Sequence, residues 1–179
     1  IDLKNEKYYD ARIKFESVSS KAPLSNESIK SQLMVGFIHY INLNYDDAIL
    51  SFSRLITKYP AYTDIDYAYY MKAMCYYEQI ENEELDGKMN HEALQSFNQI
   101  INRFPYSEYT QDSQQKIIAI KENIASKHMN IGFFYLEKQK YFAALNRYKS
   151  VVDDHSTSKF VPEALYRLVE IYYKLGMVE

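Results

Sequence analysis

Residues 45–60 read YDDAILSFSRLITKYP, in which three apolar side chains keep the spacing of a single helix face. Ala48, Phe52 and Leu55 follow one another at intervals of four and three residues, so they stack along one side of a helix. The small side chain of Ala48 lets a neighbouring helix approach closely, and Pro60 stands where the helix has to end. The stretch therefore predicts one helix of a closely packed helical hairpin.

The same pattern of tyrosine, alanine, aromatic, aliphatic and proline occurs four times along the chain. Its members are Tyr8, Ala11, Phe15, Val18 and Pro23, then Tyr45, Ala48, Phe52, Leu55 and Pro60, then Asn90, Ala93, Phe97, Ile100 and Pro105, and finally Tyr141, Ala144, Tyr148, Val151 and Ser156. A hydroxyl residue suited to capping a helix follows each proline, namely Ser25, Thr63 and Ser107. Each copy therefore predicts a helix, a stop and the start of the next helix.

Small residues stand twelve positions before two of the alanines, at Gly36 and Gly132, and Ala73 takes the same place in the repeat between them. The combined pattern resembles the tetratricopeptide repeat (TPR) of about 34 residues, in which a first helix A packs against a second helix B. We therefore expect an all-α fold, a TPR-like right-handed superhelix of antiparallel helix pairs, with about eight helices and no strands.

The repeats are expected to form a single solenoid over residues 1–179, with amino-terminal repeats in 1–104 and a long helix and carboxy-terminal repeats in 105–179. Residues 81–89 are polar and acidic and predict a loop inserted into the middle repeat. Residues 107–140 contain no proline and keep helical spacing throughout, which predicts one long helix.

Residues 60–72, PAYTDIDYAYYMK, resemble the P-x-H-x-x-I-D-Y-x-x-Y-x-(K/R) segment of BamD-type outer-membrane assembly lipoproteins, with Tyr62 at the histidine position. Further segments agree in the same order: Arg103–Tyr109, Phe134–Leu136, Asn146–Arg147, Glu163–Leu165 and Leu175–Gly176. The resemblance spans nearly the whole chain. The signal peptide, the lipidated cysteine and the first A helix of that family have no counterpart here.

The resemblance implies a lipid-anchored subunit of the β-barrel assembly machinery on the periplasmic face of the outer membrane, with the anchor missing from this fragment. It implies docking on the POTRA domain of BamA, contact with other assembly-machinery lipoproteins, and reception of unfolded outer-membrane barrel proteins. The family's Asn-Arg pair matches Asn146 and Arg147, which are therefore the expected partner-binding residues. Since Arg147 precedes the core position Tyr148, we expect its guanidinium to point away from the hairpin seam, free to pair with a carboxylate.

Aromatic side chains stand at A-helix positions that are expected to line a peptide groove. These residues are Phe37, Tyr40, Tyr67, Tyr70 and Tyr77. Tyrosine rings can pack against a peptide while their hydroxyl groups bond its backbone. The competing interpretation is that about half of these rings pack against neighbouring helices. Family resemblance favours the groove, because the amino-terminal repeats of that family are implicated in substrate recognition.

The sequence carries little that is typical of catalysis or of cofactor binding. The formal net charge of −3 argues against a nucleic-acid partner. The histidines, His39, His91, His128 and His155, lack metal-ligand spacing, and Cys75 is the only cysteine. Phosphate-binding and nucleophile motifs are absent from the sequence, and no apolar run is long enough to span a membrane. We therefore expect no enzyme activity, no cofactor and no metal site.

Two alternatives remain beside the assembly subunit. A generic TPR adaptor or co-chaperone would grip an acidic peptide tail through Lys and Asn on its A helices, but Leu33, Phe37 and Tyr40 make those positions apolar and aromatic. A helical enzyme is the other alternative, with its site on a segment outside the given sequence. A signal peptide and lipidation cysteine in the full reading frame would distinguish the assembly subunit from both.

Overall fold

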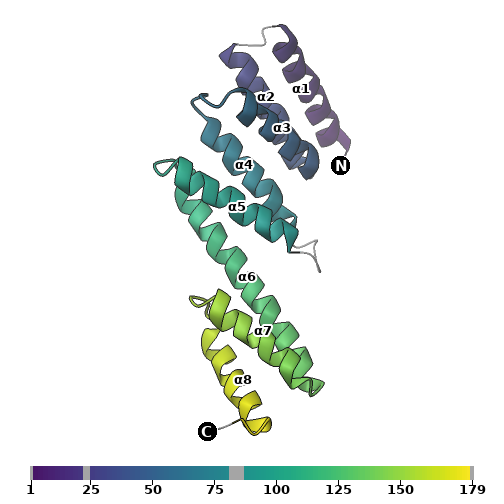
Figure 1. The fold of residues 1–179 in the computed structure, drawn as a ribbon. Helices are drawn as coiled ribbons and strands as arrows, with labels where there is room; N and C mark the ends of the chain where they lie inside the picture. Colours follow the sequence, from purple (N-terminus) through teal and green to yellow (C-terminus); the bar gives the residue numbers. More distant parts are fainter. Residues whose placement is uncertain (1, 22–24, 81–86, 178–179) are drawn as a thin grey trace. The chain divides into compact units, whose positions relative to one another are not determined.

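The computed structural model describes residues 2–21, 25–80 and 87–177. Within these residues the chain forms helices and no strand (Figure 1). The helices are α1 (Asp2–Lys21), α2 (Asn26–Ile41), α3 (Tyr45–Lys58), α4 (Ile65–Glu78), α5 (Lys88–Arg103), α6 (Tyr109–Glu137), α7 (Tyr141–Asp154) and α8 (Val161–Lys174). The expected all-α architecture of about eight helices is confirmed.

The chain divides into two compact units, unit 1 (Ile1–Ile117) and unit 2 (Ile118–Glu179). Unit 1 holds α1 to α5 and the beginning of α6, whereas unit 2 holds the rest of α6 together with α7 and α8. The arrangement of residues 1–179 as one solenoid stays a prediction.

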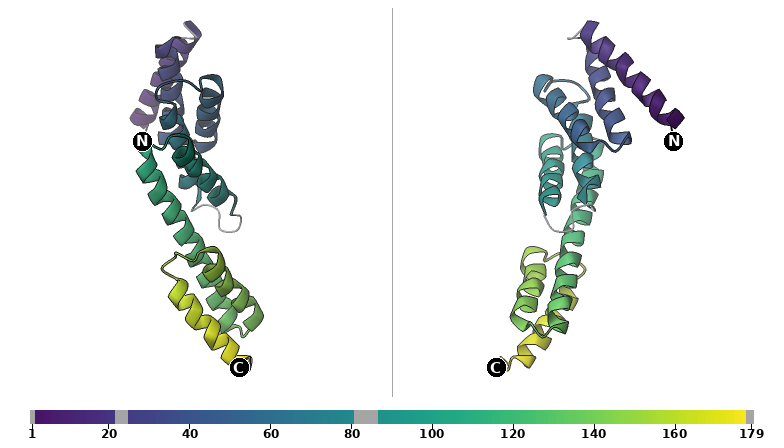
Figure 2. Two further views of the ribbon diagram at one scale, coloured as in Figure 1. Left: turned by 60° about the vertical axis from the view of Figure 1, so that its left-hand side comes forward. Right: turned by 90° about the vertical axis from the view of Figure 1, so that its right-hand side faces the viewer.

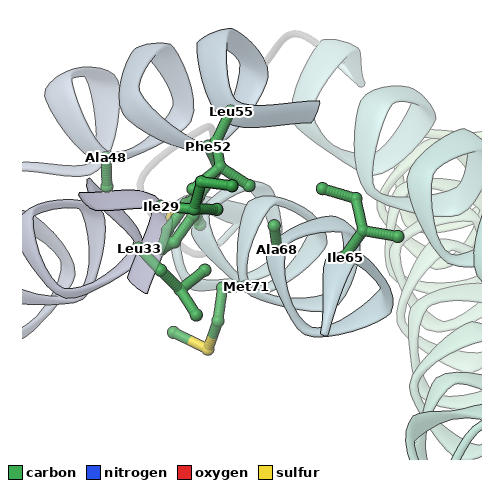
Figure 3. Close-up of a cluster of buried hydrophobic side chains, with 9 residues drawn as sticks. Ile29, Leu33, Ala48, Phe52, Leu55, Ile65, Ala68 and Met71 are labelled. Atoms are coloured by element: carbon green, nitrogen blue, oxygen red, sulfur yellow. The ribbon is translucent and has the colours of Figure 1, made fainter. Parts of the chain in front are cut away.

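The alanine, the aromatic residue and the aliphatic residue of the pattern are buried in its second, third and fourth copies. Residues with an exposed fraction of at most 1% include Ala48, Phe52, Leu55, Ala93, Phe97, Ile100, Ala144, Tyr148 and Val151. Figure 3 shows Phe52 and Leu55 of α3 pointing toward Ile29 of α2, above Ala68 and Met71 of α4. One repeated triplet therefore forms the centre of each hairpin in both units.

The small residue on each A helix is explained by the aromatic ring that faces it. A methyl group added at Gly36 would lie 2.7 Å from Cε1 of Phe52, and one at Gly132 would lie 2.8 Å from Cε1 of Tyr148. Figures 1 and 2 show α7 lying along the later turns of α6, where the second of these contacts occurs. The spacing from glycine to ring is the same in both pairs, so the two hairpins share one register.

The first copy of the pattern is less deeply buried than the others. Ala11 and Phe15 are half-buried, and Val18 is 37% exposed. The helix that carries them, α1, packs mainly on α2, and a helix with one main neighbour leaves more of its surface to solvent. Pro23 of this copy lies outside the described residues.

Two of the three expected helix caps are present. The Ser25 hydroxyl accepts the backbone N–H of Ser28 at 3.1 Å, and the Ser107 hydroxyl accepts that of Tyr109 at 3.2 Å. The expectation for Thr63 is wrong. The N-cap of α4 is Asp64, one residue further on, and its side chain makes no capping hydrogen bond.

The long helix expected within residues 107–140 is confirmed as α6, with 29 residues. The loop expected at residues 81–89 is tested only at its last three residues. Gly87 is the N-cap of α5, which already begins at Lys88, so the last two residues of the expected loop are helical. Residues 81–86 lie outside the described residues.

Candidate functional site

The five expected groove residues lie in unit 1, on α2 and α4. All are half-buried, and each contacts at least one other aromatic ring. Together with Tyr109 they form what we call the aromatic face: Phe37, Tyr40, Tyr67, Tyr70, Tyr77 and Tyr109. The residues that sequence reasoning placed together are therefore close in space, but they pack extensively on their own chain.

Tyr40 connects α2 with α4. Its ring centroid lies 6.5 Å from that of Phe37 and 5.8 Å from that of Tyr45. Its hydroxyl group donates a hydrogen bond to Oε1 of Glu78 at 3.4 Å. Burial, together with the Glu78 charge, raises the pKa of Tyr40 to about 12. The hydroxyl is therefore a donor at neutral pH, and that donor is already used within the chain.

Tyr70 connects α4 with α6. Its ring is stacked on Tyr109 at a centroid distance of 4.8 Å, and Tyr67 lies 5.5 Å from the same ring. The Tyr70 hydroxyl donates to Oδ2 of Asp112 at 2.7 Å. Burial first, and then this carboxylate, raise the pKa of Tyr70 above its ordinary value. The short, charge-assisted bond fixes the ring between the two helices.

Tyr77 completes the aromatic face near the end of α4. Its ring meets Phe97 edge-on at 6.2 Å, and Nζ of Lys116 lies 4.4 Å from its centroid, a cation–π contact. The hydroxyl groups of Tyr67 and Tyr77 have no hydrogen-bond partner within residues 2–21, 25–80 and 87–177. These two hydroxyls are therefore the ones available to a bound peptide.

Sequence reasoning missed the contribution of α6 to the aromatic face. Tyr109, Asp112 and Lys116 supply a ring, a carboxylate and an ammonium group against Tyr70 and Tyr77. Their spacing of three and four residues on a helix was a usable signal, since it places them on one side. The spacing does not predict which tyrosines of α4 these three side chains contact.

In unit 2, the expected partner-binding residues lie next to each other on α7. Asn146 is exposed and Arg147 is half-buried. In the part of the chain that the structure describes, the Arg147 guanidinium has no hydrogen bond and no ion pair. Arg167 on α8 differs, because its guanidinium nitrogens lie 3.0 Å from carboxylate oxygens of both Glu163 and Glu170. Arg147 therefore keeps its donors available for a partner.

Two histidines that sequence reasoning set aside lie together in unit 2. The rings of His128 on α6 and His155, the C-cap of α7, are 6.2 Å apart between centroids. Burial first, then the charges of Arg147 and His155, lower the pKa of His128. Because the pKa is lower in the folded chain, protonation of His128 destabilises the fold as pH falls below the unfolded value of about 6.5.

Cys75 lies in the core of unit 1, and burial raises the pKa of its thiol to about 12. At pH 8 only about one thiol in ten thousand is then a thiolate, so the folded chain should resist alkylation. We expect iodoacetamide to label Cys75 only after denaturation, as followed by intact mass. Labelling of the native chain within minutes would contradict the buried placement.

Residues 2–21, 25–80 and 87–177 hold no group of three or more His, Cys, Asp and Glu side chains that could bind a metal ion. None of the described helices combines the length and the apolar character needed to cross a membrane.

The paired helices and the recurring contacts between a small residue and an aromatic ring define a TPR-like scaffold. The model of a family described as "Outer membrane lipoprotein" (YfiO) matches residues 1–179, so the chain belongs to this family. The resemblance seen in the sequence is thereby confirmed at the level of the family.

Curated relatives agree with the family match, and each is named "Outer membrane protein assembly factor BamD". The protein of Caulobacter vibrioides is 38% identical over 165 residues, which cover 92% of this chain and 54% of the relative. That of Rickettsia prowazekii is 35% identical over 175 residues, covering 98% and 70%. That of Neisseria gonorrhoeae is 25% identical over 183 residues, covering 97% and 68%. The chain therefore spans about half the length of the Caulobacter protein.

Proposed function

We propose that this chain is the helical-repeat part of an outer-membrane protein assembly factor, which acts by binding proteins rather than by catalysis. The observation that carries the proposal is the family match over all 179 residues. The relatives' names supply the assembly role. In this proposal the full-length protein works on the periplasmic face of the outer membrane, held there by a lipid anchor, alongside other assembly lipoproteins.

Docking on the POTRA domain of BamA is proposed for unit 2. The support from this chain is the pair Asn146 and Arg147, one exposed and the other with an unpaired guanidinium. Arginine offers a planar fork of donors that suits a partner carboxylate, and it is enriched at residues that dominate interface energies. Binding of this chain to a purified BamA POTRA fragment, measured by calorimetry, tests the proposal directly. Absence of binding at high micromolar concentrations would contradict it.

Reception of unfolded barrel proteins is proposed for the aromatic face of unit 1. Its rings offer apolar surface, and the hydroxyl groups of Tyr67 and Tyr77 are free to bond a peptide backbone. The hydroxyl groups of Tyr40 and Tyr70 already bond Glu78 and Asp112, so their part is limited to ring contact. The chaperone-tail adaptor is disfavoured, since an acidic tail would meet mainly aromatic rings, and the Asp112 carboxylate lies there as well as the Lys116 ammonium group.

Replacing Tyr67 and Tyr77 together by alanine should reduce crosslinking to a carboxy-terminal peptide of a barrel protein by about fivefold. The reason is the loss of two rings and of both free hydroxyl groups, each ring contact contributing about 0.5–1.5 kcal/mol. Photo-crosslinking yield with a labelled peptide is the measurement. Tyr106→Ala is the matched control, because Tyr106 is fully exposed and lies outside the aromatic face. If the natural chain, the double variant and Tyr106→Ala all give equal crosslinking yields and native circular dichroism spectra, the rings of Tyr67 and Tyr77 have only a structural role.

A further inference from the structure

A small cavity of about 290 Å³ opens on unit 1 where the first turns of α4 meet the end of α5. It is lined by Tyr69 on α4 and by Gln99, Asn102 and Arg103 on α5. Figure 1 shows these two helices side by side. Pockets that bind small molecules range from about 300 to 1,000 Å³, so this cavity lies at their lower limit. Its size suits a single side chain rather than a large ligand.

The end of α5 brings the lining groups together. Gln99, Asn102 and Arg103 follow one another at helical spacing, which places them on one side of α5. The next residue, Phe104, is the C-cap of α5, and its ring centroid lies 5.3 Å from that of Tyr69. The groups that line the cavity are therefore carried by helices, which hold a site more precisely than loops do.

Arg103 is held in place by groups that carry no charge. Its Nη1 donates a hydrogen bond to the Tyr69 hydroxyl at 2.8 Å, and its Cζ lies 5.3 Å from the ring centroid of Tyr69 and 5.7 Å from that of Phe104. Within residues 2–21, 25–80 and 87–177 it has no ion pair, unlike Arg167, which pairs with two carboxylates. Arg103 is thus oriented, and its positive charge remains uncompensated by a carboxylate of the described chain.

Several hydrogen-bonding groups at the cavity remain unused. The Nε and Nη2 atoms of Arg103 have no partner in the described part of the chain, and neither do the side-chain amides of Gln99 and Asn102. The Tyr69 hydroxyl accepts from Arg103 and keeps its own proton as a donor. The cavity therefore offers a charged fork, a hydroxyl donor and two amides that can both donate and accept.

This set of groups matches a carboxylate carried by a polypeptide. Two parallel N–H groups of a guanidinium suit the two oxygens of a carboxylate. One positive charge balances one carboxylate, whereas a phosphate monoester carries about 1.5 to 2 negative charges at pH 7. The amides of Gln99 and Asn102 can pair with the N–H and C=O groups of a peptide backbone. Both residues are exposed, so a chain can cross the cavity and continue in both directions.

We propose that Arg103 and Tyr69 form a binding site for the acidic side chain, Asp or Glu, of an extended protein segment whose backbone is bonded by Gln99 and Asn102. Charge complementarity selects this occupant. The site uses no residue of the aromatic face and none of α7, so it holds or fails independently of the proposed function.

Titration of the whole chain with acetyl-glutamate amide tests the site, followed through the ¹⁵N–H signals of the Arg103 Nε and of the Asn102 side chain. We expect both signals to shift with saturation in the millimolar range, and acetyl-glutamine amide, which lacks the charge, to leave them in place. In Arg103→Gln, the Asn102 signal should no longer respond. Arg54→Gln is the matched control and should bind as the natural chain does, because Arg54 is an exposed arginine of unit 1 with no ion pair among the described residues.

Two conservative variants test the assigned roles of the fork and the hydroxyl. Arg103→Lys keeps the charge but loses the fork, and we expect it to bind the probe at least about fivefold more weakly. Tyr69→Phe keeps the ring but loses the hydroxyl that orients Arg103 and donates to the ligand, and we expect a loss of about threefold. Affinities of both variants equal to that of the natural chain would overturn the assignment.

Two further probes identify the source of the anion. Inorganic phosphate should bind more weakly than acetyl-glutamate amide, and so should acetyl-glycine, whose carboxylate stands for a chain terminus. Tighter binding of phosphate would make the cavity a general anion site, and tighter binding of acetyl-glycine would make it a site for a carboxy terminus; either result overturns the proposal. Shifts that persist in Arg103→Gln, or no shifts in the natural chain, would also overturn it.

Discussion

Arg147→Glu is expected to weaken binding to the BamA POTRA fragment by at least about 2 kcal/mol, which is about thirtyfold in Kd. The substitution removes an unpaired guanidinium and places a negative charge where we propose that a partner carboxylate sits. Repulsion between two carboxylates then adds to the loss of a charged pair. The measurement is titration calorimetry at a fixed ionic strength, because salt screens the exposed part of the interaction.

Lys149→Glu provides the control for this experiment. Lys149 lies on the same helix, is exposed, and undergoes the same change of charge. We expect Lys149→Glu to change Kd by no more than about threefold, as exposed charges contribute little. The melting temperature of Arg147→Glu should stay close to that of the natural chain, since Arg147 makes no ion pair or hydrogen bond in the described residues. Loss of binding together with unfolding would make Arg147 a structural residue instead.

The parts of the fold that depend on short sequence spacing were predictable. Ala48, Phe52 and Leu55 determine one helix face within eight residues, and the structure buries all three. The glycine and the ring that it faces belong to the same hairpin, so Gly36 and Phe52 were also within reach of the repeat pattern. Such local patterns carry most of an all-α repeat fold, because each repeat packs chiefly on its neighbours.

The site was predictable only in part, because its contacts depend on how the side chains pair between helices. The bond between Tyr70 and Asp112 joins residues 42 positions apart. Nothing in the local sequence shows that this hydroxyl group is used internally while that of Tyr67 remains free. The proximity of His128 to His155 likewise depends on how α6 packs against α7. The position of each histidine in the sequence does not show it.

The cap of α4 illustrates the same limit on a smaller scale. Thr63 and Asp64 are both residue types that favour N-cap positions. Composition alone does not choose between them, and the backbone places Asp64 at the cap. A one-residue difference of this kind leaves the packing of Ile65 and Ala68 unchanged in the core, where both are almost fully buried.

Gly36→Val is expected to lower the free energy of unfolding of unit 1 by about 3 kcal/mol, since overpacking a closely packed core costs about this much. The new Cβ would lie 2.7 Å from Cε1 of Phe52, a ring with an exposed fraction of 0%. Hydrogen exchange of the α2 and α3 amides, together with urea denaturation, measures the change. Gly87→Ser is the control, because a Cβ at Gly87 meets nothing within 4 Å.

The contact between Gly36 and Phe52 also predicts how the two sites couple. Phe52→Leu alone should be destabilising, since it removes buried ring atoms. In the double variant Gly36→Val with Phe52→Leu, the smaller side chain gives the new methyl groups room, so the combined loss should fall short of the sum by about 1 kcal/mol. Strict additivity in this double-mutant cycle would mean that valine is accommodated by a shift of α2 rather than by the ring. The glycine would then be required for the spacing between α2 and α3 rather than for its contact with this ring.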